Sequence, residues 1–469
     1  MISKINERKK ISAGDKMKNK PVHLGEDYDL IISGYSHQGE GIGRIDNFAI
    51  FVMGAVLDEK VKVKITEVKK NFARGQLEEI ILSSPFRVEP RCSVYNFCGG
   101  CQLQHIVYEK QLEIKKVMVQ DALMRLGHQK VEVLPVIGME FPWRYRNKGH
   151  FQVEQEKGKL HLGFYRAGSY DFIPASGCVL FSSQINKLVS YLEESLSLQK
   201  VVVYNRRTGK GNLRNILIRE SRDNREIMMV FITKEESLGF GQSILNNITR
   251  IFPQVVSIYQ NINKGYRSVL LGKDFRLLKG KVDLEDAIGP FRFKISPQSF
   301  FQVNVAQAQI LNEKILEYSH LSGEETVIDS YCGTAAISIY LANYAKKVYG
   351  IEIEKSAIRD AKINSELNQI FNLKFFTGRV EEWLYRWRKR GEKAQIIIVD
   401  PPRKGCSLKT LKEMVKIKPE QILYVSCNPA TLARDLKYLT KDDYKLEKVL
   451  PIDMFPQTGH IECLAYLKR

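Results

Sequence analysis

The 469-residue sequence predicts an α/β protein built from three folded parts. From about residue 291 onward, apolar strand patterns alternate with helical patterns, which predicts a doubly wound, Rossmann-like parallel sheet. Near the amino terminus, short alternating strands separated by glycines predict a small OB-like β-barrel. We therefore expect a disordered basic arm at 1–21, the barrel at 22–83, a mixed α/β central domain at 84–290 and the doubly wound domain at 291–469.

The composition favours a polyanionic partner. Lys and Arg number 72 against 53 Asp and Glu, a net charge of +19, and each phosphate that such a surface neutralises releases counterions. Nucleic acid is the leading candidate, although a generally basic enzyme would have the same composition. No run approaches the roughly 18 apolar residues that span a bilayer, and the polar amino terminus lacks the apolar core of a signal peptide. We expect a cytoplasmic monomer without membrane contact.

The barrel is predicted from three segments in which apolar and polar residues alternate, Tyr28–Ile32, Ala49–Met53 and Val61–Ile65. A tight turn is marked by three glycines, Gly39, Gly41 and Gly43. Barrels of this type bind the backbone of single-stranded nucleic acid. The lysine-rich segment 60–74 suits that role, or forms a solvated face.

A group of cysteines opens the central domain. Cys92, Cys98 and Cys101 lie within ten residues, and Gly99-Gly100 lets the chain curl around a metal centre. Cys178 is the best remote fourth ligand, because the remaining cysteines belong to the carboxyl-terminal region. Four thiolates suit either zinc or an iron-sulfur cluster. Spacing alone leaves that choice open, and the frequency of zinc in cytosolic proteins places zinc slightly ahead.

The rest of the central domain combines one helix with several strands. The apolar spacing of Tyr108–Leu126 predicts the helix. Three apolar segments predict strands: Val201–Tyr204, Ile216–Arg219 and Ile227–Ile232.

The carboxyl-terminal domain carries a predicted cofactor pocket. Its strands are expected at Thr326–Asp329, Lys347–Ile351, Ile396–Val399 and Ile422–Val425. A glycine turn at Gly333 follows the first strand, and Glu352 ends the second, 19 residues later. In parallel sheets a ligand binds beyond the carboxyl ends of the strands, where an acidic residue can accept hydrogen bonds from ribose hydroxyls. A purely structural turn would leave the same pattern.

Three side chains near the strand ends are candidates for chemistry. Cys427 follows an apolar strand, and a thiolate there can add to an electrophilic carbon such as carbon 6 of a uracil ring. Glu462, a carboxylate among apolar neighbours, is the candidate base, because burial would raise its pKa. Asp400 follows a strand and precedes two prolines that stiffen the turn, so it is placed to orient substrate or cofactor. A buried structural cysteine and a solvent-facing glutamate are the alternative interpretations.

Four motifs in order resemble the RNA (uracil-5-)-methyltransferase family: SPQSFFQVN (296–304), DPPRKG (400–405), SCNPATLARD (426–435) and DMFPQTGHIE (453–462). The segment SGYSHQGEGIGRIDNFAIFV (33–52) resembles the TRAM domain, and the whole resemblance covers roughly 27–469. It implies S-adenosylmethionine-dependent methylation of carbon 5 of a uridine in RNA. Cys427 is the implied nucleophile and Glu462 the implied general base.

The resemblance also implies which residues bind the cofactors. The residues implied for S-adenosylmethionine are Gln302, Tyr331, Glu352 and Asp400. Family members with CGGCQLQH, present here at 98–105, carry a 4Fe-4S cluster. The resemblance therefore favours an iron-sulfur cluster over zinc as the occupant of the site. It implies Cys92, Cys98, Cys101 and Cys178 as ligands. Two positions depart from the family pattern: Ala335 replaces a usual glycine, which is tolerable if its backbone stays in an ordinary region, and Arg379 replaces a polar or acidic residue.

The implied target is 23S rRNA, because a TRAM domain together with the cluster is typical of enzymes acting on it. A tRNA uridine-54 C5 methyltransferase and a noncatalytic RNA-binding protein are the alternatives. The target uridine must be flipped out of its surroundings. We expect Arg144, Arg146 and Lys148 to hold the RNA backbone. Phe300 or Phe301 is expected to stack on bases, although both also suit a core.

Overall fold

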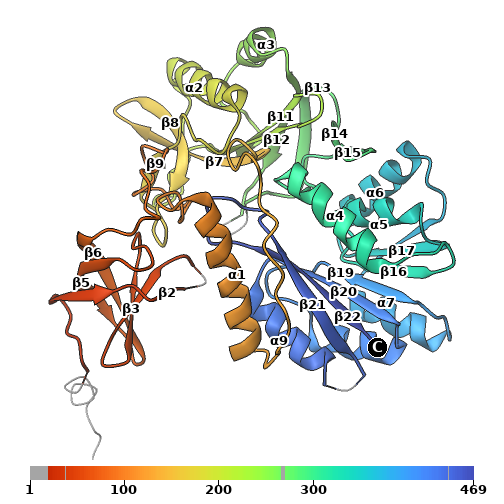
Figure 1. Cartoon of the computed structure of the whole chain (residues 1–469). Coiled ribbons are helices and arrows are strands. Elements are labelled where there is room, and N and C mark those ends of the chain that lie inside the picture. Colours follow the sequence, from red (N-terminus) through yellow and green to blue (C-terminus); the bar gives the residue numbers. More distant parts are fainter. Residues whose placement is uncertain (1–19, 37, 266–269, 442) are drawn as a thin grey trace, which may run out of the picture. The chain divides into compact units, whose positions relative to one another are not determined.

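The computed structural model describes residues 20–36, 38–265, 270–441 and 443–469 (Figure 1). The chain divides into two compact units, Met1–Glu89 with His105–Val107 and Pro90–Gln104 with Tyr108–Arg469. The arm expected at 1–21 lies outside the described residues except for its last two. No described helix is long and apolar enough to cross a membrane.

The first unit is a six-stranded sheet that curls on itself, with the strand order β1-β5-β6-β4-β3-β2. Its strands are β1 (Asp27–Ile31), β2 (Gly34–Tyr35), β3 (Gly41–Ile45), β4 (Phe48–Val52), β5 (Lys60–Val68) and β6 (Phe72–Leu82). A Cβ atom at Gly43 would lie 3.1 Å from the Cβ of Leu30, so β3 approaches β1 closely. The predicted amino-terminal barrel is confirmed as a curled β half-barrel.

The basic segment 60–74 forms β5 and the start of β6. Part of its charge is neutralised within the unit, since Arg74 forms ion pairs with Glu40 at 3.0 Å and with Glu67 at 3.2 Å. Lys64 and Lys70 remain exposed.

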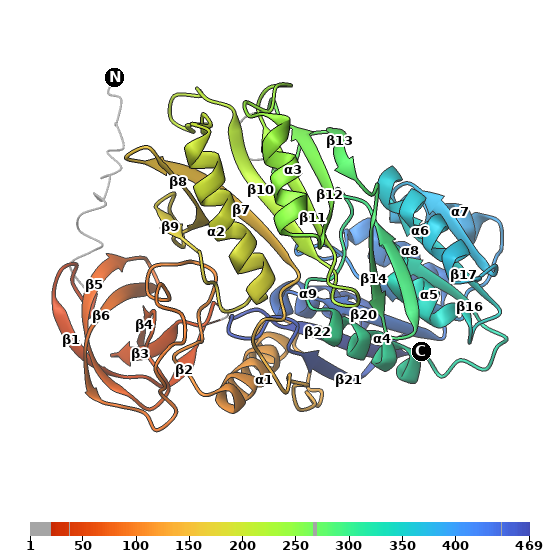
Figure 2. The same ribbon diagram turned by 90° about the horizontal axis from the view of Figure 1, so that it is seen from above.

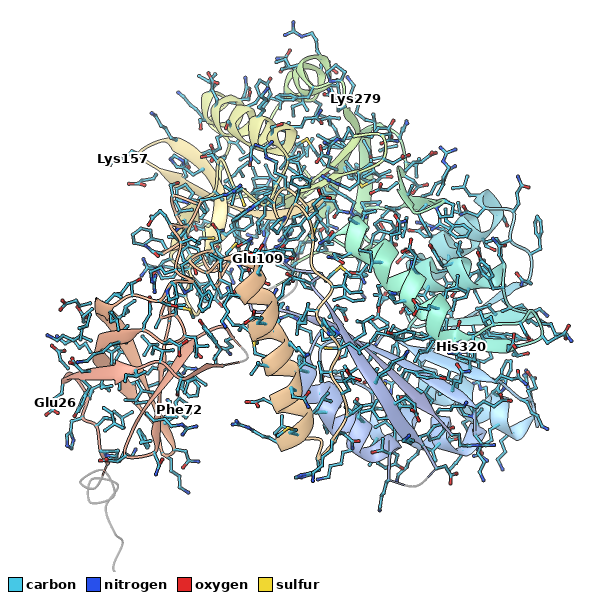
Figure 3. The ribbon with its side chains drawn as sticks, in the orientation of Figure 1. Glu26, Phe72, Glu109, Lys157, Lys279 and His320 are labelled. Carbon is cyan, nitrogen blue, oxygen red and sulfur yellow. The ribbon has the colours of Figure 1, made fainter. Side chains whose placement is uncertain are left out.

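The central part of the second unit is a seven-stranded sheet with the order β13-β12-β11-β10-β7-β8-β9. Its strands are β7 (Lys148–Glu156), β8 (Lys159–Tyr165), β9 (Phe172–Pro174), β10 (Leu213–Glu220), β11 (Ile227–Thr233), β12 (Val255–Ile262) and β13 (Asp274–Gly280). Helices α2 (Ser183–Leu198) and α3 (Gln242–Ile251) cover one face, where the apolar core of this part lies (Figure 2). Figure 3 labels Lys157 in the turn after β7 and Lys279 on β13.

Of the three strands predicted in this region, two are confirmed and the prediction for Val201–Tyr204 is wrong. Ile216–Arg219 and Ile227–Ile232 lie in β10 and β11, but Val201–Tyr204 forms only an isolated bridge between Val203 and Leu213. The segment runs along the base of a loop, with the Tyr204 N–H donating to the Leu213 carbonyl at 2.8 Å. Val201 and Val203 pack against the core, whereas Val202 is exposed, and the segment joins no ladder.

The carboxyl-terminal part is a seven-stranded sheet with the order β18-β17-β16-β19-β20-β22-β21. Its strands are β16 (Thr326–Ser330), β17 (Lys347–Glu352), β18 (Leu373–Thr377), β19 (Ile396–Val399), β20 (Gln421–Ser426), β21 (Lys445–Ile452) and β22 (Glu462–Lys468). All neighbours are parallel except β22, which is antiparallel to β20 and β21. The hairpin β14 (Leu284–Ile288) and β15 (Phe291–Ile295) precedes it.

Helices cover both faces of this sheet, because alternate residues of its strands face two different cores. Ile396 and Ile398 of β19 belong to one core, and Ile397 and Val399 to the other. The helices are α4 (Val305–Ser319), α5 (Ala336–Ala342), α6 (Lys355–Leu367), α7 (Val380–Lys389), α8 (Leu408–Ile417) and α9 (Pro429–Leu439). Helix α1 (Tyr108–Arg125), as predicted, packs residues into the second core. The predicted α/β class and doubly wound sheet are confirmed.

Candidate active site

Four strand ends meet at one edge of the carboxyl-terminal sheet. Strand β16 ends at Ser330 and β17 at Glu352, while Asp400 follows β19 and Cys427 follows β20. Because these strands are parallel, their carboxyl ends lie at the same edge. The chain leaves β16 toward β17 on one side and continues from β19 toward β20 on the other. Such a switch point is where ligands bind in doubly wound sheets.

Glu462 reaches this edge on an antiparallel strand. It is the first residue of β22, and the β20–β22 ladder pairs Ser426 with Cys463. One step further along the register, Glu462 lies opposite Cys427. The Glu462 side chain is only 4 % exposed, and Cys463 belongs to a core on the opposite face of the sheet. The end of the chain therefore brings a carboxyl to the candidate nucleophile.

The turn that carries Cys427 is fixed by hydrogen bonds. The side-chain oxygen of Asn428 accepts from the Ala430 N–H at 3.0 Å and caps α9. The Asn428 amide donates to the Arg403 carbonyl at 3.2 Å, and so does the Thr431 hydroxyl, at the same distance. Cys427 itself is partly exposed. Its thiol is thus held beside the loop that follows β19 and remains accessible to a ligand.

The loop after Asp400 is anchored by the end of the SCNPATLARD motif. The Asp435 carboxylate accepts from the Cys406 N–H at 2.8 Å and from the Tyr424 hydroxyl at 2.6 Å. Gly405 has φ +74°, and a Cβ atom there would lie 2.6 Å from both Arg434 and Asp435. The sequence did not suggest this supporting role for Arg434 and Asp435.

The two carboxyls at the site are shielded from water to different extents, because Glu462 is buried and Asp400 is partly buried. Burial raises the pKa of Glu462 well above its usual range, the charge of Asp400 raises it further, and the Arg403 guanidinium lowers it. Burial also raises the pKa of Asp400, to about 6. Oε1 of Glu462 has no hydrogen-bond partner among the described residues. An unpaired buried polar atom costs about 1 to 3 kcal/mol, so this oxygen is poised for a group that arrives with substrate.

The Cys427 thiol is neutral at rest. Burial raises its pKa to about 11, with a further increase from the charge of Glu462; Arg403 lowers it and Asp400 raises it. Nη2 of Arg403 lies 3.3 Å from Nε2 of His460, which places this cation at the same site. Protonation of a neighbouring carboxyl therefore favours the thiolate, because it removes a like charge.

The loop before Glu462 is held by one face of α1. Asp453 accepts from the Tyr108 hydroxyl at 2.8 Å and forms a salt bridge with Lys115 at 2.5 Å, and both charged side chains are fully buried. The Gln111 amide donates to Oε1 of Gln457 at 3.0 Å, and the Gln457 N–H donates back to Oε1 of Gln111 at 3.2 Å. Positions 108, 111 and 115 share one face of a helix.

Residues from the cysteine segment and the central domain complete this support. The N–H groups of Gln102 and Leu103 donate to the Gln457 carbonyl at 3.1 and 3.0 Å, and the Gly459 N–H donates to Oε1 of Gln102 at 3.3 Å. The Tyr145 hydroxyl donates to the Pro456 carbonyl at 3.0 Å. The candidate base therefore follows a loop whose partners lie more than 300 residues earlier in the chain.

The residues expected to bind the cofactor are only partly brought together. Glu352 ends β17, one strand away from the switch point between β16 and β19, and its Oε2 accepts from the Gly333 N–H at 3.2 Å. Its carboxylate retains lone pairs for ribose hydroxyls. The Tyr331 ring packs against the core beside this edge. Gln302 is held through its backbone, whose carbonyl accepts from the side-chain amide of Asn147 at 3.0 Å.

Ala335 has a left-handed backbone conformation, which glycine adopts more readily than alanine. It has φ 70° and ψ 29° and directly precedes α5. We expected alanine to be tolerated here if its backbone stayed in an ordinary region. The structure shows that it does not. A left-handed conformation costs a non-glycine residue about 1 kcal/mol, and such strain is typical of functional loops.

Four cysteines line a single cavity of about 280 Å³: Cys92, Cys98, Cys101 and Cys178. Burial raises the pKa of the Cys101 thiol to about 12 and that of Cys178 to about 11, and neighbouring cysteines add to both increases. No three Cys, His, Asp or Glu side chains in the described part of the chain form a group that could hold a metal ion as they stand. The cysteines thus surround a common space without converging on one point.

The expected RNA-contacting residues divide into exposed and buried ones. Phe301 is core, 5.6 Å from the Phe293 ring, whereas Phe300 is 64 % exposed. Arg144 is exposed, but Lys148 is largely enclosed, and burial lowers its pKa to about 7. Lys148 therefore does not suit the phosphate contact that the sequence suggested.

Comparison with known proteins agrees with this geometry. Residues 267–469 match the tRNA (Uracil-5-)-methyltransferase family, and residues 21–77 match the TRAM domain. An uncharacterized RNA methyltransferase of Clostridium tetani is 46% identical over 447 residues, which are 95% of this chain and 97% of that relative. The chain belongs to the RNA (uracil-5-)-methyltransferase family. A similar protein of Bacillus cereus is 43% identical over 449 residues, 96% of this methyltransferase and 98% of that one.

A solved structure extends the similarity to three dimensions. The tRNA (uracil-54, C5)-methyltransferase of Pyrococcus abyssi, in complex with S-adenosyl-L-homocysteine, has a TM-score of 0.74 and 29% identity. The match covers 94% of this methyltransferase and 99% of the archaeal chain. The shared architecture therefore includes the central domain as well as the catalytic sheet.

Proposed function

We propose that this methyltransferase acts on carbon 5 of a uridine in RNA with Cys427 as nucleophile and Glu462 as general base. The observation that carries the assignment is the β20–β22 register, which pairs Ser426 with Cys463 and so supports a position for Glu462 opposite Cys427. The charge of Asp400 acts on both groups. The reaction needs a group that adds to the ring and a group that removes a proton. This edge of the sheet supplies both.

The steps assigned to the chain balance on the uracil ring. The Cys427 thiol first loses its proton to solvent, which its partial exposure allows. Sγ of the resulting thiolate forms a bond to carbon 6, and the electron pair of the 5,6 double bond moves to carbon 5 and the carbonyl at carbon 4. After carbon 5 has gained the methyl group, Glu462 removes its proton. The double bond then forms again, and the carbon 6–sulfur bond breaks with its electron pair returning to sulfur.

S-adenosylmethionine, when bound, supplies the methyl group and a positive sulfonium that favours the ionised forms of nearby carboxyls. We propose Glu352, Asp400, Gln302 and Tyr331 as the residues that hold it. Two observations support this proposal: Glu352 stands at the strand end beside the Gly333 turn, and the archaeal relative holds S-adenosyl-L-homocysteine.

Two variants test the catalytic assignment on a 5-fluorouridine RNA and on ordinary RNA. Cys427→Ala should abolish both 5-methyluridine formation and covalent trapping, a loss on the order of 10³-fold or more. Glu462→Gln should still add to carbon 6 but stall release, because a general base contributes roughly 10² to 10⁴-fold. The covalent protein–RNA complex, resolved on a denaturing gel, should then accumulate on ordinary RNA.

The matched control for the nucleophile is Cys463→Ala. Cys463 adjoins Glu462 but is buried in the core on the opposite face, so this variant should retain adduct formation. Methyl transfer by the Cys427 variant, or loss of trapping in the Cys463 variant alone, would overturn the assignment.

A 4Fe-4S cluster is the proposed occupant of the cysteine cavity, with Cys92, Cys98, Cys101 and Cys178 as ligands. Around zinc, four sulfurs lie about 2.3 Å from a single point. In a four-iron cluster each thiolate binds a different iron, so the ligands stand further apart, and the four cysteines line one cavity of about 280 Å³ that could hold such a group. Methyl transfer moves no net electrons, so the cluster's role is structural. Iron and sulfide analysis of protein purified without oxygen distinguishes the cluster from zinc.

Large-subunit ribosomal RNA, 23S rRNA, is the proposed target, supported by the combination of TRAM domain and cysteine cluster. Transfer RNA is a second candidate, favoured by the similarity to the archaeal tRNA (uracil-54, C5)-methyltransferase. Mass-spectrometric mapping of 5-methyluridine in both RNAs from a deletion strain separates the two, since the modification should disappear from one of them.

A further inference from the structure

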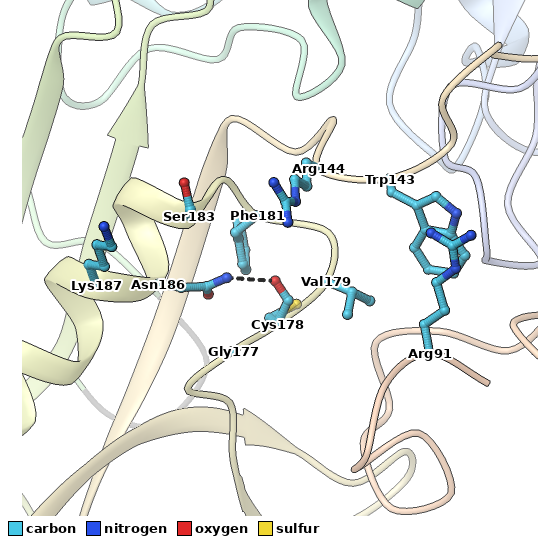
Figure 4. A pocket seen from close by; sticks show the side chains of 10 residues that line it. All are labelled: Arg91, Trp143, Arg144, Gly177, Cys178, Val179, Phe181, Ser183, Asn186 and Lys187. Carbon is cyan, nitrogen blue, oxygen red and sulfur yellow. Dashed lines mark hydrogen bonds between the residues drawn. The ribbon is translucent and has the colours of Figure 1, made fainter.

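A second pocket lies beside the cysteine cavity and contains none of the proposed catalytic residues. It has a volume of about 430 Å³, and Figure 4 shows the residues that line it. They come from the segment before β7, from the turn between β9 and α2, from the first turn of α2, and from Arg91. All of them belong to the second unit.

The lining of this pocket is strongly basic. Arg91, Arg144 and Lys187 contribute three cations, and no Asp or Glu lines it. All three side chains are exposed, and neither Arg144 nor Lys187 forms an ion pair with a described residue. The pocket also opens at the amino-terminal end of α2, whose Ser182 cap precedes Ser183, and this end of a helix carries partial positive charge. The occupant should therefore be an anion.

The pocket also offers a flat surface and a polar anchor. The Arg91 guanidinium lies over the Trp143 ring, 4.9 Å from its centroid (Figure 4). Nucleobases stack on aromatic rings and on guanidinium planes. The Asn186 amide donates to the Cys178 carbonyl at 3.0 Å, while its oxygen has no hydrogen-bond partner among the described residues. A cationic wall beside a stacked plane suits a nucleotide better than a free phosphate ion.

The backbone at Arg144 is strained in a way that presents its side chain. Arg144 has φ 51°, a left-handed conformation that a side chain this bulky rarely adopts. It is held there from both sides, because its N–H donates to the Val179 carbonyl at 3.1 Å and its carbonyl accepts from Arg222 at 3.1 Å. Strain retained in this way is typical of binding residues.

The segment that forms the pocket also reaches the catalytic machinery. Arg144 lines the pocket, and the next residue, Tyr145, donates its hydroxyl to the Pro456 carbonyl in the loop before Glu462. Two residues further on, the Asn147 amide holds the Gln302 carbonyl. A ligand bound in the pocket is therefore fixed relative to both sides of the active site.

We propose that this pocket binds an unpaired nucleotide of the substrate RNA other than the uridine that is methylated. Its phosphate meets Arg144 and Lys187, and its base stacks on the plane formed by Arg91 and Trp143. The site sets the register of the RNA on the enzyme. The proposal rests on RNA being the substrate, but it assigns no role in the chemical steps.

The test compares charge-removing variants that leave the fold intact. Arg144→Gln combined with Lys187→Gln should weaken binding of the full substrate RNA roughly tenfold. The slope of log binding constant against log salt concentration should fall by an amount that corresponds to about 1 to 2 phosphate contacts. The maximal rate at saturating RNA should stay within about twofold of the wild type. Arg250→Gln combined with Lys437→Gln removes the same charge from exposed helix positions elsewhere, and it should leave affinity within about twofold.

Trp143→Leu separates stacking from charge. It should weaken RNA binding without changing the salt dependence, because stacking releases no counterions. Ultraviolet crosslinking of wild-type protein to substrate RNA should yield a modified peptide that contains Trp143. Equal affinity of the Arg144 and Lys187 double variant and its control, or an unchanged KM with a reduced kcat, would overturn the proposal. The same assay also measures whether the wild-type protein forms 5-methyluridine. Failure of the catalytic proposal would appear in that measurement, and failure of the pocket proposal would appear in the comparison of the variants.

Discussion

The loops that carry the proposed nucleophile and the proposed base are supported in different ways, and we call them the nucleophile side and the base side. The loops that carry Cys427 and Asp400 are joined to each other by Asn428, Thr431 and Asp435, whose partners lie fewer than 30 residues away. The loop before Glu462 depends on partners more than 300 residues earlier, on α1, in the cysteine segment and beside β7. The carboxyl-terminal sheet and its loops hold the nucleophile side, whereas contacts from several parts of the second unit hold the base side.

This difference separates the two halves of the reaction. In the proposed reaction, addition of the Cys427 thiol to carbon 6 depends on the nucleophile side, which the α/β sheet builds by itself. The proposed proton removal also needs Glu462, and the loop that precedes Glu462 is held by α1 and by residues that follow Cys101. Damage to the central contacts should therefore stop the reaction after addition. A covalent protein–RNA complex that persists is the signature of such damage.

The largest expected effect comes from breaking the buried pair between Lys115 and Asp453. Lys115→Met leaves the Asp453 carboxylate buried without its cation, which should destabilise the protein by about 3 to 5 kcal/mol. The free energy of unfolding from denaturant titration measures this loss. Arg125→Met removes an exposed partner of Asp121 from the same helix and should cost less than about 1 kcal/mol.

A second variant, in which stability is restored, separates the effect of this pair on stability from its effect on catalysis. Combining Lys115→Met with Asp453→Leu removes both buried charges and should recover most of the stability, because a buried pair is worth little more than apolar residues of similar size. The anchor of the loop is still absent, so covalent adduct should accumulate in this stable variant. Normal release in the double variant would show that α1 supports the fold but not the base.

A smaller effect is expected at Gln102, the residue after Cys101. Gln102→Ala removes the acceptor of the Gly459 N–H, and the lost hydrogen bond should cost about 0.5 to 1.5 kcal/mol of stability. We expect slower release of the covalent intermediate with unchanged rates of trapping on 5-fluorouridine RNA. Gln129→Ala removes a comparable side-chain hydrogen bond, which Nε2 of Gln129 donates to Thr440 at 2.9 Å beyond the carboxyl-terminal end of α1. If both variants release product equally fast, the cysteine segment has no part in positioning the base.

The nucleophile side was largely predictable from sequence because its signals are local. Each parallel strand is an apolar run followed by a polar residue, and parallel strand ends share an edge. This is why Glu352, Asp400 and Cys427 were expected together. Glu462 was singled out for its apolar neighbours, but its position opposite Cys427 follows from an antiparallel pairing that no local pattern encodes.

The supports of the base side were not predictable for a physical reason. Tyr108, Gln111 and Lys115 form a polar stripe on α1, and such a stripe normally faces water. Here Gln111 and Lys115 are buried because they meet Asp453 and Gln457. Only the tertiary structure distinguishes a buried polar network from a solvated face.

The smallest expected effect links the two sides through charge. Burial and then the charge of Asp400 raise the pKa of Glu462, and a base must be ionised, so release of the adduct should slow as pH falls through that pKa. Asp400→Asn removes the charge and should move this acid limb to lower pH, whatever it does to the maximal rate. Single-turnover release measured across pH locates the limb, and Asp121→Asn, an exposed change on α1, should leave it in place.

Stability gives an independent check of the same coupling. A carboxyl whose pKa is raised by folding binds its proton more tightly in the folded state, so its contribution is present below the unfolded pKa and is lost as pH rises through the folded pKa. Wild-type stability should therefore decline with rising pH above the ordinary carboxyl range, and the Asp400→Asn variant should decline less. If Asp400→Asn changes neither the acid limb of the release profile nor the dependence of stability on pH, then the nucleophile side influences the base through neither charge nor contact.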